Sequence, residues 1–221
     1  MPKVSEEYVE SKKNQILDAA FEVFTQKPVF AVTMQDIIDS VGFSQGAIYR
    51  YYKDIDDIII AVHNRSFSSI DYMDKLKDVL QQELEPEQVI RQSFLCFAHY
   101  INKSSGLFSK IRLELLMLYQ AYPKRGKKIR EGLNVKESNN FALESAISFA
   151  GEQISAGYFK PIMPLDKIIS FISVSCDGIL FDDMLIKNTA LYEQPPIKVD
   201  IMELFNTLCD TVIMMLGGKM E

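Results

Sequence analysis

Apolar residues recur along most of the chain with the three- to four-residue spacing of an amphipathic α-helix. Over about residues 5–26, the apolar positions Ile16, Leu17, Ala20, Phe21 and Phe24 fall on one helical face. No Asn-Gly or Asp-Gly turn joins two runs of alternating apolar and polar residues, the usual signal of a β-hairpin. The pattern therefore predicts an all-α protein.

Prolines, glycines and capping residues divide this pattern into about nine expected helices. These run over about residues 5–26, 34–40, 44–52, 54 onwards, 86–103, 105–121, 124–156, 165–189 and 198–217. The helices before about residue 65 are short, whereas the later ones are longer and richer in Phe, Met, Leu and Ile. We therefore expect a small N-terminal domain followed by a larger helical bundle.

Two short expected helices flank a glycine turn, Ser40-Val41-Gly42-Phe43. Thr33 is a typical N-cap of the first helix, and Asp36 follows it at the spacing of a capping box. Ser44 is a typical N-cap of the second. Gly42 alone would fit an ordinary helix C-cap, but the whole spacing favours a helix-turn-helix.

The second of these helices carries side chains that suit a major groove. If the apolar residues Ile37, Ile38, Val41, Ile48 and Tyr52 pack together, then Ser44, Gln45, Ala47, Tyr49, Arg50 and Lys53 face outward. Glutamine pairs with adenine through two hydrogen bonds, and an alanine methyl contacts thymine. Tyr49 and Lys53 suit phosphate oxygens. Gln35 and Gln45 fit a solvated position equally well.

Three segments resemble the N-terminal domain of TetR-type bacterial transcriptional repressors. They are K-N-Q-I-L-D-A-A-F-E-V-F (13–24), T-M-Q-D-I-I (33–38) and V-G-F-S-Q-G-A-I-Y-R-Y-Y-K (41–53). The resemblance is specific over about residues 10–62 and loose over the rest of the chain. It implies DNA contacts by Thr33, Gln35, Ser44, Gln45, Gly46, Ala47, Tyr49, Tyr51 and Lys53. Family members usually carry a lysine where this chain has Ile55, so one phosphate contact is missing.

The resemblance also implies a division of labour between the domains. Residues 1–65 would form a three-helix helix-turn-helix DNA-binding domain, and residues 66–221 a bundle for ligand binding and dimerisation. In the family the last two long helices pair with those of a second copy. Candidate interface residues are Ile172, Ile179, Leu204, Phe205, Leu208 and Val212. A small-molecule pocket would lie among the middle helices, with Phe94, Phe97, Phe108, Met117, Phe141, Ser145 and Phe171 as candidates.

Charge and composition limit the alternatives. The 221-residue chain has a net charge of −6, and residues 1–65 carry seven basic and ten acidic side chains. Affinity for DNA therefore has to come from placed cations and helix N-termini rather than from bulk charge. The basic run Lys124–Lys128 fits a solvated loop better than a nucleic-acid patch.

No membrane span, metal or cofactor is expected. The longest stretch without Asp, Glu, Lys or Arg is Gln92–Asn102, well short of the ~20 residues that cross a bilayer. The charged N-terminus does not resemble a signal peptide, so we expect a cytoplasmic protein. Three scattered cysteines and two histidines do not have the spacing of zinc ligands.

The sequence is compatible with two functions and argues against a third. The first is a homodimeric repressor that binds a palindromic, double-stranded DNA operator and is released by an unidentified small-molecule effector. The alternative is a helical dimeric interaction protein without DNA-binding activity, for which Ile55 and the acidic N-terminal domain argue. An enzyme is not expected, because no nucleophile, base and orienting group occur together.

Overall fold

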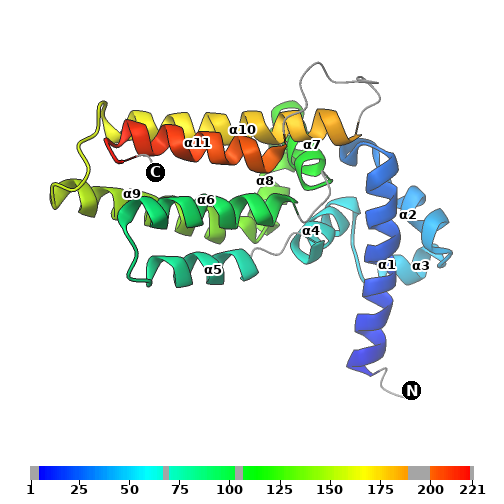
Figure 1. Cartoon of the computed structure of the whole chain (residues 1–221). Helices are drawn as coiled ribbons and strands as arrows, with labels where there is room; N and C mark the ends of the chain where they lie inside the picture. The colour runs from blue at the N-terminus through cyan, green and yellow to red at the C-terminus, as the bar shows by residue number, and fades with distance from the viewer. Residues whose placement is uncertain (1–4, 67–69, 103–106, 189–199, 220–221) are drawn as a thin grey trace. The chain divides into compact units, whose positions relative to one another are not determined.

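The computed structural model of the chain, shown in Figure 1, describes residues 5–66, 70–102, 107–188 and 200–219. These residues contain no strand, and their regular structure is α-helical apart from one 3₁₀ turn, η1 (Val29–Ala31). The helices are α1 (Glu6–Gln26), α2 (Met34–Val41), α3 (Gln45–Tyr49), α4 (Ile55–Ser66), α5 (Ile70–Leu80), α6 (Pro86–Asn102), α7 (Leu107–Ala121), α8 (Pro123–Gly132), α9 (Val135–Ser155), α10 (Leu165–Asn188) and α11 (Ile201–Met215). The expected all-α fold class is confirmed.

The described residues form eleven α-helices instead of about nine, because two expected long helices are each two separate ones. The helix expected from residue 54 onwards is α4 and α5, and the one expected over 124–156 is α8 and α9. Helix α8 ends where Leu133 turns to an extended conformation (φ −83°, ψ 132°). Its last residue, Gly132, packs against α4, since a Cβ there would lie 2.7 Å from Cδ1 of Ile60.

The chain divides into two compact units that are not continuous in sequence. The first unit contains residues 1–68 together with 111–134, so most of α7 and all of α8 join α1–α4. Helix α1 packs on α2 and α4, and α4 packs on α8. The fully buried side chains of the first unit include Phe24, Ile37, Ile48, Ile58 and Ile129, the last of which comes from α8. The assignment of DNA binding to residues 1–65 and of ligand binding and dimerisation to 66–221 stays a prediction.

The second unit contains residues 69–110 and 135–221. Helix α11 packs on both α6 and α10, and α5 packs on α6 and α9. Aromatic rings join three of these helices, because Phe97 lies 5.7 Å from Tyr72 and 5.5 Å from Phe205 between ring centroids. None of the helices in the described parts of the chain combines the length and apolar character needed to cross a membrane.

The end of α11 is tied to the start of α6 and to the connection before α10. One Glu87 carboxylate oxygen accepts the N–H of Lys219 (2.9 Å), and the other accepts the hydroxyl of Tyr158 (2.7 Å). Burial alone would raise the pKa of Glu87, but these hydrogen bonds lower it by more than burial raises it. The pKa of Glu87 therefore lies below its ordinary value. Gly217 has φ +74°, and a Cβ there would clash with the carbonyl oxygen of Lys160. Only glycine fits this position.

Gly217→Ala should therefore lower the free energy of unfolding by about 1–3 kcal/mol, because it combines a left-handed conformation with a backbone clash. Gly151→Ala is the matched control, since this glycine lies inside α9 with no atom within 4 Å of a built Cβ. It should raise the free energy of unfolding by about 0.5–1 kcal/mol. Urea denaturation followed by circular dichroism measures both, and equal effects of the two variants would contradict this account.

Candidate nucleic-acid interface

Reciprocal hydrogen bonds fix the start of α2. The Thr33 side-chain oxygen accepts the N–H of Asp36 (3.3 Å), and an Asp36 carboxylate oxygen accepts the N–H of Thr33 (2.9 Å). This arrangement confirms the predicted capping box. Lys27 also contacts the Asp36 carboxylate. The Lys27 ammonium, and after it the N–H and hydroxyl of Thr33, lower the pKa of Asp36 from 3.8 to about 2.

A left-handed glycine and a serine cap connect α2 to α3. Gly42 ends α2 with φ +69°, and no atom would lie within 4 Å of a Cβ built there. The backbone conformation, rather than lack of space, therefore favours glycine at this turn. Ser44 then caps α3, because its hydroxyl oxygen accepts the N–H of Ala47 (3.3 Å). These two residues set the angle at which α3 leaves the turn.

One side of this pair of helices is buried and the other faces solvent. Ile37 and Ile48 are fully buried and Tyr52 nearly so, which confirms Tyr52 as a core residue. Burial raises the pKa of Tyr52 to about 12. The predicted DNA-contact residues lie on the accessible side: Ala47 and Tyr51 are half-buried, whereas Thr33, Gln35, Ser44, Gln45, Gly46, Tyr49 and Lys53 are exposed. The structure thus brings α3 and its flanking residues together on one accessible surface.

Thr33 and Gln35 already have acidic partners. The Thr33 hydroxyl donates to Asp36 (2.9 Å), and the Gln35 amide donates to Asp39 (2.7 Å). A phosphate that approached either side chain would compete with these carboxylates. Their contacts with DNA stay predictions, as do those of the other seven residues.

Sequence reasoning missed one contact to the turn. The Lys12 ammonium of α1 lies over the Phe43 ring, 4.4 Å from its centroid. Phe43 directly precedes the Ser44 cap, so this cation–π contact holds the turn against α1. The two residues lie too far apart in sequence for any helical periodicity to pair them.

The basic run Lys124–Lys128 lies in helix α8, not in the solvated loop that the sequence favoured. This changes the charge balance around the helix-turn-helix. Residues 111–134 carry six basic and two acidic side chains, so the first unit has 13 basic and 12 acidic side chains in all. Its net charge is +1, whereas residues 1–65 alone carry −3. The remaining 11 basic and 18 acidic side chains give the second unit a net charge of −7.

The pocket candidates are not gathered around a described cavity. Phe94, Phe97, Phe141 and Ser145 are half-buried, and Phe171 is exposed. Met117 is 61% exposed and belongs to the first unit, while the side chain of Phe108 lies outside the described residues. A cavity of about 190 Å³ in the second unit is lined instead by Asn102, Ile179, Asp182, Asp183, Ile186, Asp200, Ile201 and Leu204. The pocket stays a prediction.

Most interface candidates pack inside the single chain. Ile172 and Leu204 are half-buried, whereas Ile179, Phe205, Leu208 and Val212 are buried. These four buried side chains have little accessible surface in the single chain, and the dimer interface stays a prediction. Four large apolar residues are exposed on α10: Phe171, Val174, Phe181 and Ile186. The first three are spaced by three and seven positions, which places them on one helical face. That periodicity was readable from the sequence but was overlooked.

Comparisons with known proteins agree with this geometry. Residues 16–62 match the family described as bacterial regulatory proteins, tetR family. The chain is 23% identical over 197 residues to the HTH-type transcriptional regulator YfiR of Bacillus subtilis, covering 81% of this chain and 83% of YfiR. It is 23% identical over 168 residues to the HTH-type transcriptional repressor KstR2 of Mycolicibacterium smegmatis, covering 73% and 74% of the two chains.

A solved structure has the same fold over nearly the full length. FadR of Bacillus subtilis, a transcriptional regulator solved in complex with stearoyl-CoA, superposes with a TM-score of 0.62 at 17% identity. The match covers 93% of this chain and 98% of FadR. At this level of identity the likeness establishes the fold.

The capping box gives α2 an acid-sensitive contribution to stability. Asp36→Asn keeps an acceptor oxygen but removes the charge, so at pH 7 it should lower the free energy of unfolding by roughly 1–2 kcal/mol. Because the folded pKa of Asp36 lies below the unfolded one, this contribution is present above about pH 4 and is lost as pH falls towards 2. Urea denaturation at pH 7, 4 and 2 should show the difference largely kept at pH 4 and mostly lost at pH 2. Asp39→Asn is the control, and a difference of the same size at pH 2 as at pH 7 would contradict the assignment.

Proposed function

This chain belongs to the TetR family of helix-turn-helix transcriptional regulators, a non-enzymatic family, and we propose that it is a homodimeric repressor released from DNA by a small molecule. The observation that carries the proposal is the exposed N-terminal end of α3. Ser44 caps that end, and Gln45 and Gly46 lie exposed beside it. A helix with small and amide side chains at its start fits the major groove and reads base edges there.

Tyr49 and Lys53 would hold the DNA backbone on either side of the bases read by α3. Tyr49 is 43% exposed although it lies next to the buried Ile48, so its hydroxyl is accessible to a phosphate oxygen. Lys53 is exposed and follows α3 directly. Contacts of this kind fix the orientation of the reading helix without distinguishing sequences.

Dimerisation would place two such helices on one palindromic operator. We infer that the exposed face of α10 with Phe171, Val174 and Phe181 contributes to the contact between copies, because large apolar residues rarely cluster on a monomer surface. A two-fold dimer reads half-sites separated by about 34–36 Å or a multiple of it. The alternative is a dimeric interaction protein without DNA binding. It would form the same dimer, but its α3 would not bind DNA.

Tyr49→Ala tests the role of α3. It should weaken binding to operator DNA by about tenfold or more, because a hydrogen bond to a charged phosphate is lost. The operator is obtained by selection from a random DNA library with the wild-type protein, and binding is measured by fluorescence anisotropy against random competitor DNA. Tyr122→Ala is the matched control, since Tyr122 is also exposed but lies at the start of α8.

Selection that enriches no sequence, from a protein that is dimeric by analytical ultracentrifugation, would favour the interaction protein. Enrichment of a palindrome together with unchanged binding by Tyr49→Ala would keep the regulator but contradict the proposed backbone contact.

The charge of the second unit favours an apolar effector that is uncharged or cationic. FadR of Bacillus subtilis was solved with stearoyl-CoA, whose CoA part carries several negative charges. The second unit of this chain has a net charge of −7, and three aspartates line its described cavity. This field opposes binding of a polyanion.

Stearoyl-CoA is therefore expected to leave the protein–operator complex intact at concentrations where an uncharged or cationic apolar inducer releases the DNA. Anisotropy of the labelled operator during titration with stearoyl-CoA, and with a panel of uncharged and cationic hydrophobic compounds, measures this. Release by stearoyl-CoA at micromolar concentration would contradict the charge argument and place the effector with that of FadR.

A further inference from the structure

Three acidic residues follow Lys53, the last predicted DNA contact. Asp54 precedes α4, and Asp56 and Asp57 lie in its first turn, where the helix dipole favours negative charge. The same charges repel a DNA phosphate near Lys53 unless something neutralises them. The surroundings of these three carboxylates therefore bear directly on DNA binding.

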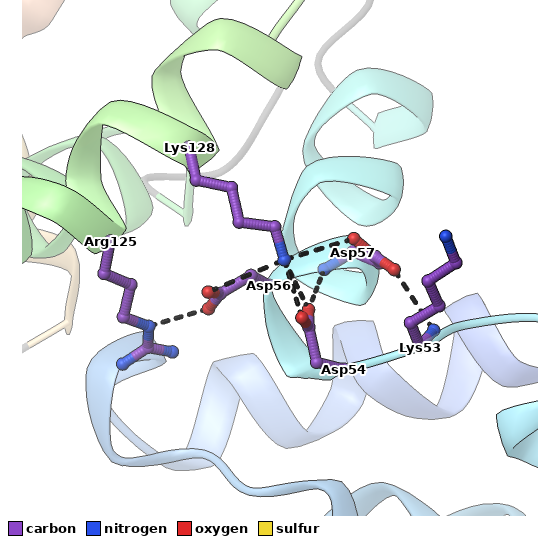
Figure 2. A network of polar contacts seen from close by, with 6 residues as sticks. All are labelled: Lys53, Asp54, Asp56, Asp57, Arg125 and Lys128. Carbon is purple, nitrogen blue, oxygen red and sulfur yellow. Dashed lines mark hydrogen bonds and ion pairs between the residues drawn. The ribbon is translucent and has the colours of Figure 1, made fainter.

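Two cations of α8 meet these carboxylates, as Figure 2 shows. The Lys128 ammonium lies 2.6 and 2.9 Å from the two carboxylate oxygens of Asp54, 3.4 Å from Asp57 and 4.0 Å from Asp56. The Arg125 Nε donates to Asp56 at 2.7 Å. Lys128 thus touches all three acids, and Arg125 holds the most buried of them, whose side chain is 13% exposed.

Two of these carboxylates also fix the backbone between α3 and α4. Asp57 accepts the N–H of Lys53 (3.1 Å), and Asp54 accepts the N–H of Asp57 (3.1 Å). A continuous chain of contacts therefore runs from Lys128 through Asp57 to the backbone of Lys53. In Figure 2 the contact of Lys53 with this cluster is made by its backbone N–H, and no drawn contact joins its ammonium to the other labelled residues.

The pKa shifts of Lys128 and Asp54 agree with an ion pair between them. The Lys128 pKa is raised, first because its ammonium donates to Asp54. The partial burial of Asp54 raises the pKa of its carboxyl, but the hydrogen bonds from Lys128 and from backbone N–H groups lower it more, to below its ordinary value.

We propose that Arg125 and Lys128 are positioning residues for DNA binding, which neutralise the acidic start of α4 and hold Lys53 in place without touching DNA themselves. The inference rests on the proposed DNA-binding function and assigns a role to a basic helix outside the helix-turn-helix.

A merely structural role for Lys128 would have a different signature. Its side chain and that of Asp54 are 45% and 49% exposed, and exposed ion pairs contribute little to folding stability. Removal of the Lys128 charge is therefore expected to lower the affinity for DNA while leaving the thermal midpoint of unfolding nearly unchanged.

The first experiment compares Lys128→Gln, Lys128→Arg and Lys127→Gln for binding to the selected operator by fluorescence anisotropy. Lys128→Gln should weaken binding roughly fivefold or more, because three carboxylates lose their shared cation. Lys128→Arg keeps the charge and should bind like the wild type. Lys127 is the matched control, since it is 69% exposed on the same helix and pairs with Glu131 rather than with α4.

A double-mutant cycle then separates positioning from direct contact with DNA. Asp54→Asn keeps the acceptor that caps Asp57 but removes the charge that Lys128 neutralises. Added to Lys128→Gln, it should recover most of the lost affinity, and by more than Asp54→Asn changes the wild type. Glu22→Gln removes an exposed acid elsewhere in the first unit, and it should give the same small change in both backgrounds.

The outcomes distinguish the two proposals. Failure of the wild type to enrich any operator overturns the DNA-binding function itself. With an operator in hand, unchanged affinity of Lys128→Gln overturns the positioning role. A weakened Lys128→Gln that Asp54→Asn does not rescue overturns it as well, because Lys128 would then act on the DNA directly.

Discussion

DNA binding, as proposed above, depends on charge compensation at the start of α4. An acidic chain that reads DNA has to keep its carboxylates away from phosphate or neutralise them. Here Asp54 and Asp57 accept backbone N–H groups at the start of α4, so neither can be removed without cost. Cations from α8 neutralise the three acids at the start of α4, and they come from residues 69 and 74 positions further along the chain that belong to the same compact unit.

Residues 111–134 hold the helix-turn-helix at three points. The Glu114 carboxylate accepts the N–H of Val29 (2.9 Å) just before α2, and the α8 cations bind the residues just after α3. At the far end of α4, the Asn64 amide donates to the Gly132 carbonyl (2.8 Å) and accepts the Asn134 N–H (2.9 Å). An effector that shifted α7 or α8 would therefore shift the entry and the exit of the reading helices together. A population shift requires a connection of this kind between an effector and the reading helices.

Local features of the fold were readable from the sequence, and long-range ones were not. The Thr33 capping box, the Gly42 turn and the Ser44 cap depend on residues at most four apart, and each was predicted. The contacts of Asp54 with Lys128 and of Val29 with Glu114 span 74 and 85 residues, and no local pattern encodes them. The burial of Phe205 and Val212 against their own chain was not predicted either. An apolar helical stripe has the same pattern whether it faces a core or a partner.

Most of α7 and all of α8 belong to the same compact unit as the helix-turn-helix. Native-state hydrogen exchange of the full chain tests it most directly, because amides of one cooperative unit open with a common free energy. We expect the amides of α8 to open with the same free energy as those of α1, α2 and α4. Added salt should change this free energy equally in all four helices. Exchange of α8 in step with α6 and α11 instead, independent of α4, would contradict this expectation.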